Sequence, residues 1–131
     1  MTKRRIATDG APAALGPYSQ GIDTGELVFC SGQLGLDPAS GQLAQGAAAQ
    51  AERALRNIGA VLDAAGCTFA DVVKTTVFLV DIGDFRVLND VYAGFFGDVP
   101  PARSTFAVAA LPKGALVEIE AIARRSRPEG G

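Results

Sequence analysis

The chain has 131 residues, of which 48% are hydrophobic and 20% charged, a composition that excludes a disordered chain. Its length fits a single domain, residues 1–131, with one core. The net charge of -2 provides no bulk positive field that would hold nucleic acid. The chain contains no histidine, so acid–base chemistry near neutral pH must use carboxylates, hydroxyls, thiols, amines or bound water.

The cellular compartment is constrained by targeting signals and cysteines. Nothing resembles a signal peptide, because Asp9 and Pro12 interrupt the apolar core that should follow Lys3–Arg5. No segment approaches the ~20 apolar residues of a membrane span. Cys30 and Cys67 are too few for a disulfide scaffold, and we expect both as buried small hydrophobes. We therefore expect a cytoplasmic protein with no structural zinc or other metal site.

The first third of the chain predicts strands and turns. Arg4–Thr8 is a short strand candidate, followed by a loop of small residues. Ser19–Asp23 and Leu27–Gly32 flank Thr24-Gly25-Glu26, a pattern that indicates a hairpin. Asp37–Gly41 places proline and glycine where a turn requires them.

The middle of the chain predicts two helices around a strand. Apolar residues recur every three or four positions over Ala47–Ala65, and Gly66 suits the end of this helix. Asp71–Val80 is rich in Val, Thr and Phe, which favours a buried strand. A second helix is expected from about Asp84 to Phe96, with Asp84 as its N-cap. Its apolar stripe would consist of Phe85, Leu88, Tyr92 and Phe95.

Two strands, Ser104–Leu111 and Leu116–Arg124, are expected at the end of the chain. This order of elements predicts an α+β fold: a single-layer, mixed β-sheet with two helices packed on one face. Two helices cannot cover both faces of such a sheet. We therefore expect the uncovered apolar face to be buried in a closed homo-oligomer.

Arg103 is a candidate for binding a carboxylate. It follows Pro100 and Pro101, which restrict the backbone, so the arginine extends from a stiff stem. A planar guanidinium can bind a substrate carboxylate through two parallel N–H bonds. An arginine at the start of a strand can equally pair with an acidic neighbour.

Glu118 and Glu120 are candidates for proton transfer. They lie two residues apart on the last strand, so they share one face. On a solvated face they would be ordinary polar positions. Their flanking residues are nearly all apolar, which favours a raised pKa and an exchange of protons with a bound water.

Two hydroxyls each lie beside a glycine or a proline that permits close approach of the backbone. Tyr18 is either a core aromatic with a satisfied hydroxyl or a site residue. Ser31, before Gly32, can offer a hydroxyl and backbone N–H groups to a carboxylate or an oxyanion. Because the chain has no histidine, Ser31 lacks the usual base that activates a serine nucleophile.

The spacing of Arg103 and Glu118 constrains the site. If the last two strands formed a simple hairpin around Pro112–Gly114, Arg103 would lie near Arg124 and about 20 Å from Glu118. One chain could not then bind one small molecule with both groups. Either these strands are not neighbours, or the site is built between subunits.

A set of motifs follows in order over nearly the whole chain. They are APAALGPYSQG from Ala11, CSGQ from Cys30, VKTTVF from Val73, DFRVLN from Asp84, PARST from Pro101, LPKG from Leu111 and VEIEAIA from Val117. Together these motifs resemble the RidA/YjgF family. The resemblance implies a chorismate-mutase-like α+β fold and a homotrimer with a site in each inter-subunit cleft.

The deaminase branch of that family hydrolyses reactive 2-imino acids, such as 2-iminobutanoate and 2-iminopropanoate, to 2-oxo acids and ammonia without a cofactor. By resemblance, Arg103 is the carboxylate-binding arginine and Glu118 the glutamate that holds the attacking water. Tyr18 would hydrogen-bond the tetrahedral intermediate. Thr105 stands where some members have a cysteine, which leaves the substrate preference open. The remaining substrate-binding positions would be Ser31, Gly32, Phe85, Asn89 and Thr105.

Two alternatives accompany this expectation. Some members of the family are described as ribonucleases or translation inhibitors, but the net negative charge and the lack of histidine oppose RNA cleavage here. A non-catalytic module that binds a small ligand is the other alternative, and the presence of both Arg103 and Glu118 argues against it. No nucleic-acid or membrane partner is expected.

Overall fold

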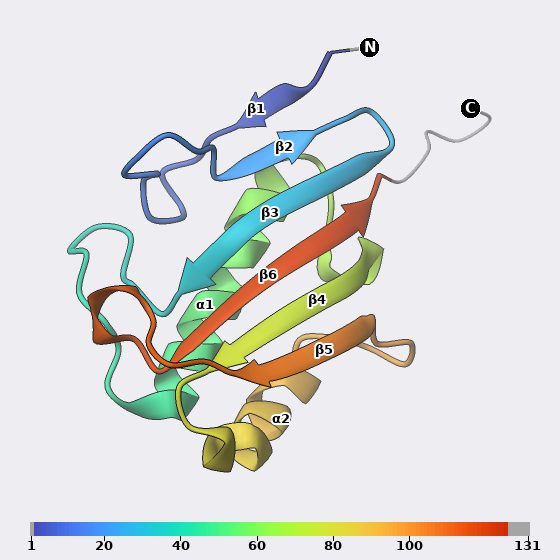
Figure 1. Ribbon diagram of the computed structural model, residues 1–131. Helices are drawn as coiled ribbons and strands as arrows, with labels where there is room; N and C mark the ends of the chain where they lie inside the picture. Colours follow the sequence, from blue (N-terminus) through green and yellow to red (C-terminus); the bar gives the residue numbers. More distant parts are fainter. Residues whose placement is uncertain (1, 126–131) are drawn as a thin grey trace.

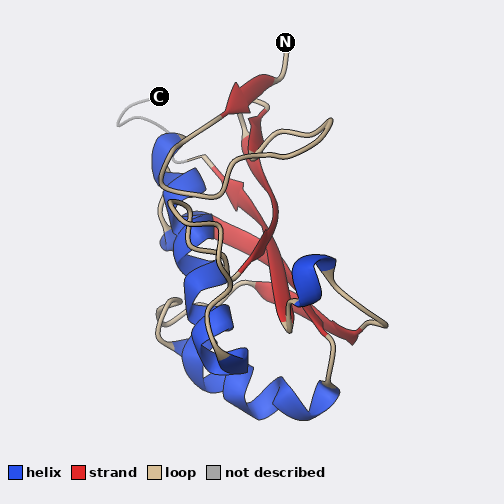
Figure 2. Ribbon diagram, turned by 90° about the vertical axis from the view of Figure 1, so that its left-hand side faces the viewer, coloured by secondary structure: helices blue, strands red, loops and turns tan. Residues whose placement is uncertain are grey.

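The computed structural model describes residues 2–125. Six strands form one mixed sheet in the order β1-β2-β3-β6-β4-β5, and the two helices pack on one of its faces (Figures 1 and 2). This arrangement confirms the predicted α+β fold. The elements are β1 (Arg4–Ile6), β2 (Gly21–Asp23), β3 (Leu27–Leu34), α1 (Gly46–Ala64), β4 (Val72–Leu79), α2 (Phe85–Ala93), β5 (Ala102–Ala107) and β6 (Val117–Arg124).

The predicted hairpin is the β2–β3 pair. Its turn closes through a bond from the Thr24 N–H to the Leu27 carbonyl at 2.9 Å, and Gly25 takes a φ of 100° that favours glycine. On its other side β3 pairs with β6, and the register shifts between Cys30 and Gln33. This β-bulge interrupts the regular alternation of β3 where Ser31 and Gly32 lie.

Helix α1 forms where the periodicity predicts it, and it buries Leu55, Ile58 and Leu62 against the sheet. It ends at Ala64, and Gly66 lies just past the helix end as expected, with a φ of 79° that lets the Cys67 N–H donate to the Leu62 carbonyl at 2.8 Å. Both cysteines are buried, also as predicted, and their thiols are free. Burial raises the pKa of the Cys30 thiol to about 12, which makes it unreactive.

The start of α2 differs from the prediction. Asp84 occupies the N-cap position, but its side chain does not cap the helix. Its ψ of 3° is outside the extended region from which a side chain can reach the free N–H groups. Instead Asp81 accepts from the Gly83 N–H at 2.8 Å, in a short 3-10 turn, Ile82–Asp84, that leads into the helix. In the apolar stripe Leu88 and Tyr92 are buried, whereas Phe85 is exposed.

The last two strands do not form a hairpin, because β4 lies between them. β5 runs parallel to β4 and forms an edge of the sheet, while β6 is antiparallel to β4 and β3. The β4–α2–β5 crossover makes this possible, since a parallel pair requires a long connection. The distance expected from a simple hairpin therefore does not apply.

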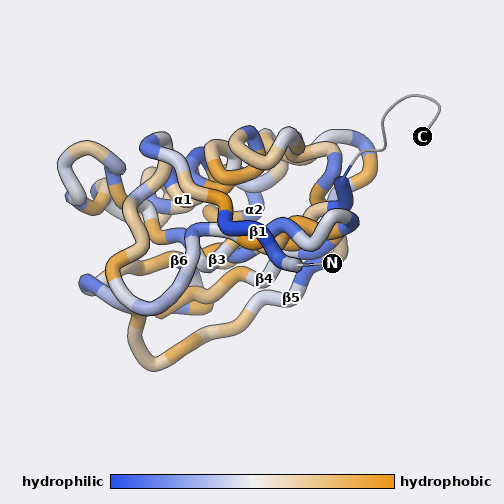
Figure 3. Tube along the Cα trace, turned by 90° about the horizontal axis from the view of Figure 1, so that it is seen from above, coloured by the Kyte–Doolittle hydropathy of each residue, from blue (hydrophilic) through white to orange (hydrophobic). Residues whose placement is uncertain are grey.

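The core lies between the sheet and the helices, and Figure 3 shows these two layers from above. The alternation predicted for β6 is confirmed, because Val117, Ile119, Ala121 and Ala123 are all buried. The opposite face of the sheet, here called the open face, carries the alternate residues. Its aromatic side chains include Phe29 and Phe106, which are 40% and 53% exposed, a large apolar surface for a single chain.

Asp23 links the two ends of the described chain. Its carboxylate accepts from Arg4 at 2.8 Å and from Arg125 at 2.9 Å, and it is almost completely buried. Burial by itself would raise the pKa of Asp23, but bonds from Gly25 and Arg4 and the charge of Arg125 lower it below its ordinary value. Arg125 also donates to the Ala65 carbonyl at 2.6 Å, which connects β6 to the end of α1.

No helix among residues 2–125 combines the length and the apolar character needed to cross a bilayer.

Candidate functional site

Arg103 extends from the start of β5 toward α2. Its guanidinium donates to Asn89 Oδ1 at 2.7 Å and lies 4.8 Å from the ring centre of Tyr92 and 5.4 Å from that of Phe85. These three α2 residues are spaced by four and three positions, so they lie on one side of the helix. Among residues 2–125, Arg103 forms no salt bridge. Its charge is therefore available to an anion rather than committed to an acidic neighbour.

Tyr92 is the residue at this place that the sequence motifs did not identify as part of the site. Its hydroxyl lies 2.6 Å from Thr75 Oγ1, and Thr75 is the residue directly opposite Arg103 in the β4–β5 ladder. Burial raises the pKa of Tyr92, while the bond with Thr75 and the charge of Arg103 oppose this effect. The neutral ring of Tyr92, held by Thr75, thus packs against the Arg103 guanidinium in a cation–π contact.

A pocket of about 490 Å³ adjoins Arg103. Its polar groups are Arg103 and Asn89, and the rest of its wall comes from aromatic, proline and small residues, including Phe96, Pro100 and Pro101. A pocket with a single cation and one amide in an otherwise apolar wall suits a small anion with a short apolar substituent.

Glu118 lies on the open face, between the inward-facing Val117 and Ile119. Its carboxyl group covers Gly32 so closely that a Cβ atom at position 32 would lie 2.9 Å from the Glu118 Cδ. Burial, and then the charge of Glu120, raises the pKa of Glu118. Such a carboxyl group is well suited to taking up a proton and returning it.

The loop that carries Tyr18 is attached to β3 at Ser31. The Ser31 hydroxyl donates to the Ser19 carbonyl at 2.6 Å, and the Ser31 N–H donates to the Gln20 carbonyl at 3.0 Å. Both donors of Ser31 are thus engaged, and its hydroxyl oxygen remains able to accept. Tyr18 is 55% exposed and accepts a long 3.4 Å bond from the Leu15 N–H, so it is not a core aromatic.

The candidate residues therefore form two groups. Each group lies on adjoining segments of the fold, and neither contains both Arg103 and Glu118. The Arg103 half-site comprises Arg103, Phe85, Asn89, Tyr92 and Thr105, and the Glu118 half-site comprises Tyr18, Ser31, Gly32 and Glu118.

The two half-sites of one chain lie on opposite faces of the sheet. Arg103 is opposite Thr75, a buried residue that faces the helices, and Thr105 shares that face through its partner Val77. Glu118 is opposite Phe78 and points to the open face. In register, the Cα atoms of Arg103 and Glu118 are two strands and three residues apart, about 14 Å. One small molecule cannot contact both side chains within one chain.

The fold and these half-sites define a small α+β domain that offers a guanidinium in a pocket and a carboxyl group on the opposite face. The chain belongs to the family described as Endoribonuclease L-PSP, whose model matches residues 8–125. This is the RidA/YjgF family that the sequence motifs resemble, so that expectation is confirmed.

Three similar proteins illustrate the relationship. A 2-iminobutanoate/2-iminopropanoate deaminase of Bos taurus is 56% identical over 124 residues, which cover 94% of this chain and 90% of that protein. A protein with the same description from Salmonella typhimurium is 49% identical over 125 residues, covering 93% and 98%. The crystal structure of the YjgF gene product of E. coli has a TM-score of 0.91 at 47% identity and covers 94% of this chain and 99% of its own.

Proposed function

We propose that this protein is a cofactor-independent deaminase that hydrolyses reactive 2-imino acids to 2-oxo acids and ammonia. Its substrates would be 2-iminobutanoate and 2-iminopropanoate, the compounds named for its relatives. The observation that carries the proposal is the Arg103 guanidinium, which is held by Asn89 and Tyr92 beside a pocket and lacks a carboxylate partner among the described residues.

The proposed active unit is a cytoplasmic homotrimer. Because the half-sites lie on opposite faces of one sheet, the Arg103 half-site of one protomer would meet the Glu118 half-site of the next. Such a head-to-tail contact closes into a ring, and the exposed aromatic residues of the open face would be buried in it. The number of protomers follows the family resemblance. The free, buried thiols of Cys30 and Cys67 fit a reducing compartment.

The chemistry follows from the charges of the two half-sites. Arg103 binds the carboxylate of the imino acid and holds its C=N carbon near Glu118 of the adjacent protomer. Glu118 takes a proton from a water as the oxygen adds to that carbon, and it returns a proton to the nitrogen. In the second step Glu118 takes the hydroxyl proton of the resulting carbinolamine and passes a proton to its nitrogen, so that the C–N bond breaks, the C=O bond forms and ammonia leaves. The raised pKa of Glu118 suits this exchange.

Tyr18 and Ser31 complete the proposed Glu118 half-site. The Tyr18 hydroxyl donates a hydrogen bond to the oxygen of the tetrahedral intermediate, where charge develops. The Ser31 hydroxyl donates to Ser19, so toward a ligand it acts as an acceptor. Tyr18 therefore contributes a bond that is made only after water has added, which should affect kcat more than KM.

The test is a comparison of two arginine variants. Arg103→Ala should abolish the acceleration of imine hydrolysis, measured as ammonia release from 2-iminobutanoate generated in situ. Arg56→Ala is a matched control, because Arg56 forms only an exposed pair with Glu52 on α1, at 3.2 Å. It should retain the wild-type rate. A folded Arg103→Ala protein with an unchanged rate would overturn the proposal.

A further inference from the structure

Tyr18 lies in the loop between β1 and β2, and its side chain makes few contacts of its own. Residues 7–20 contain turns and bends but no helix or strand. Tyr18 is 55% exposed, and its local contacts are a 2.9 Å bond from its N–H to the Gly16 carbonyl and the long bond from Leu15. The place of the phenol therefore depends on how the backbone of this loop is held.

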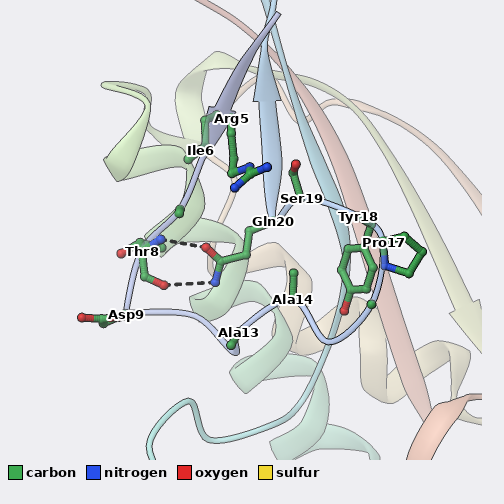
Figure 4. A pocket seen from close by; sticks show the side chains of 12 residues that line it. Arg5, Ile6, Thr8, Asp9, Ala13, Ala14, Pro17, Tyr18, Ser19 and Gln20 are labelled. Carbon is green, nitrogen blue, oxygen red and sulfur yellow. Dashed lines mark hydrogen bonds between the residues drawn. The ribbon is translucent and has the colours of Figure 1, made fainter.

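The side-chain amide of Gln20 fixes the backbone of this loop through hydrogen bonds. Gln20 is only 5% exposed, and its side chain turns back into the loop rather than toward solvent (Figure 4). Its Oε1 accepts from the Thr8 N–H at 2.7 Å, while its Nε2 donates to the Thr8 carbonyl at 3.0 Å. The amide thus pairs with Thr8 as a neighbouring strand would, just beyond Ile6, where β1 ends.

The same Nε2 also reaches the far side of the loop. It donates to the Pro12 carbonyl at 2.8 Å and to the Ala11 carbonyl at 3.2 Å. Three carbonyls from either side of the turn at residues 9–10 therefore converge on one nitrogen. If that nitrogen were removed, these buried or partly buried oxygens would lose their common donor.

The main chain of Gln20 connects the loop to the Glu118 half-site. Its carbonyl accepts from the Ser31 N–H, and the neighbouring Ser19 carbonyl accepts from the Ser31 hydroxyl. Gln20 therefore bonds both the first part of the loop, at Thr8 to Pro12, and the β3 segment that precedes Gly32. Tyr18 lies on the short stem between these two attachments, beside a pocket of about 790 Å³ (Figure 4).

We propose that Gln20 is a positioning residue for imine hydrolysis, which acts by fixing the loop so that the Tyr18 hydroxyl faces the reacting carbon. This inference rests on the proposed function and adds a residue that no sequence motif assigned to the site. Gln20 does not touch the substrate. Its effect passes through Tyr18, and this makes the two residues energetically coupled.

The test is a double-mutant cycle on the assembled protein. Gln20→Met keeps the length and apolar bulk of the side chain and removes its hydrogen bonds. We expect it to lower kcat on the order of ten- to hundredfold with little change in KM, because the bond from Tyr18 is made after water addition. In a Tyr18→Phe background the same change should lower kcat less than about twofold, since the hydroxyl that it misplaces is already absent.

Gln50 provides a matched control. It is also 5% exposed, and its amide bonds the Ala44 carbonyl at 3.1 Å and the Leu116 N–H at 2.8 Å, away from the Tyr18 loop. Gln50→Met should reduce thermal stability to a similar degree and leave kcat within about twofold of the wild type. Equal losses of kcat in the two glutamine variants, or additive losses in the cycle, would overturn the inference.

A measurement without turnover covers the case in which Gln20→Met folds poorly. Gln20→Glu keeps the volume and the acceptor for the Thr8 N–H but loses the donors to the three carbonyls. The chain has two tyrosines and no tryptophan, so Tyr92→Phe leaves Tyr18 as the only strong emitter. In that background Gln20→Glu should lower the fluorescence anisotropy of Tyr18, and an unchanged anisotropy would contradict the proposal. Failure of the Arg103 test alone would refute the deaminase function and leave this loop result standing.

Discussion

At the scale of single residues, each half-site depends on the residues that lie directly beside its charged side chain. Gly32 has no side chain because the Glu118 carboxyl group occupies that space. Arg103 keeps its charge unpaired within the described chain because its neighbours on α2 are an amide and two aromatic rings. In both half-sites, neighbouring residues thus determine the position of the charged side chain or leave its charge unpaired.

Gly32→Ala tests the first of these contacts. The added methyl group should displace the Glu118 carboxyl group, since a contact of 2.9 Å to Cδ cannot be tolerated. We expect at least a tenfold loss of kcat/KM. The loss of stability should stay below about 1 kcal/mol, because the displaced atoms are the end of a flexible side chain. Both can be measured by ammonia release and by denaturant unfolding.

Gly94→Ala is the control for that substitution. Gly94 follows α2 with a helical φ of -74°, and a Cβ atom there would meet its nearest neighbour, the Val91 carbonyl, at an ordinary 3.5 Å. Activity and stability should both remain near the wild-type values. A Gly32→Ala protein that behaves like Gly94→Ala would show that Glu118 does not need its observed position.

The sequence singled out the candidate residues but did not place them relative to one another. Arg103 and Glu118 stand in distinctive motifs, and the predicted alternation of β6, which the structure confirms, puts Glu118 on the face opposite Val117. Tyr92 was assigned only to an apolar stripe. Its contact with Arg103 depends on how α2 packs against β5, and helical periodicity does not specify that packing.

At the scale of elements, α1 and the β2–β3 hairpin followed from periodicity and turn residues, because both are determined by residues close in sequence. The position of β4 between β5 and β6 was not predicted from the sequence. That order joins segments far apart in the chain, and the turn residues around Pro112 resemble those of a hairpin. The prediction that the Asp84 side chain caps α2 was wrong for a related reason, since the short turn before α2 changes the backbone conformation of Asp84.

Asp23 joins β2 to Arg4 of β1 and to Arg125 just after β6, and its removal should weaken both contacts. Asp23→Asn removes the charge that Arg4 and Arg125 share, in a place that is only 3% exposed. We expect a loss of about 1–3 kcal/mol in the free energy of unfolding at neutral pH, the range for hydrogen bonds to a charged group. Asp63→Asn, at an exposed position of α1, should cost much less.

The contribution of Asp23 should depend on pH in a definite direction. Its pKa is lowered on folding, so the folded state binds fewer protons than the unfolded state in the acid range. The stabilisation is therefore complete above the ordinary aspartate pKa and is lost as the pH falls through the lowered folded value. Unfolding free energies of wild type and Asp23→Asn, measured against pH, should converge in acid, and a constant difference would contradict this role.

At the scale of the whole molecule, the opposite placement of the half-sites makes a strong prediction about mixtures. Arg103→Ala and Glu118→Gln should each be inactive alone. In a ring with head-to-tail contacts, co-assembly at equal amounts leaves about one cleft in four with both native groups, so about a quarter of the wild-type activity should return. The check is ammonia release after the two variants are unfolded and refolded together.

Two outcomes of the mixing experiment are informative. Activity equal to the sum of the separately refolded variants would mean that no cleft combines groups from two protomers. Recovered activity that co-migrates with a single-chain mass in sedimentation would contradict the assembly itself. The confirmed fold class by itself predicts neither result, because the same sheet could carry a site on one face.

The two edge strands of the sheet differ in how they discourage pairing with another chain. β1 has only three residues, two of them arginines, whereas β5 has six residues with a single charged side chain, Arg103, and exposes Phe106. A short, charged edge strand discourages further pairing, and a longer one with a single charge is less protected. A lone protomer therefore has one edge strand open to non-native pairing, and a neighbour that covered Phe106 would also protect the protein from aggregation.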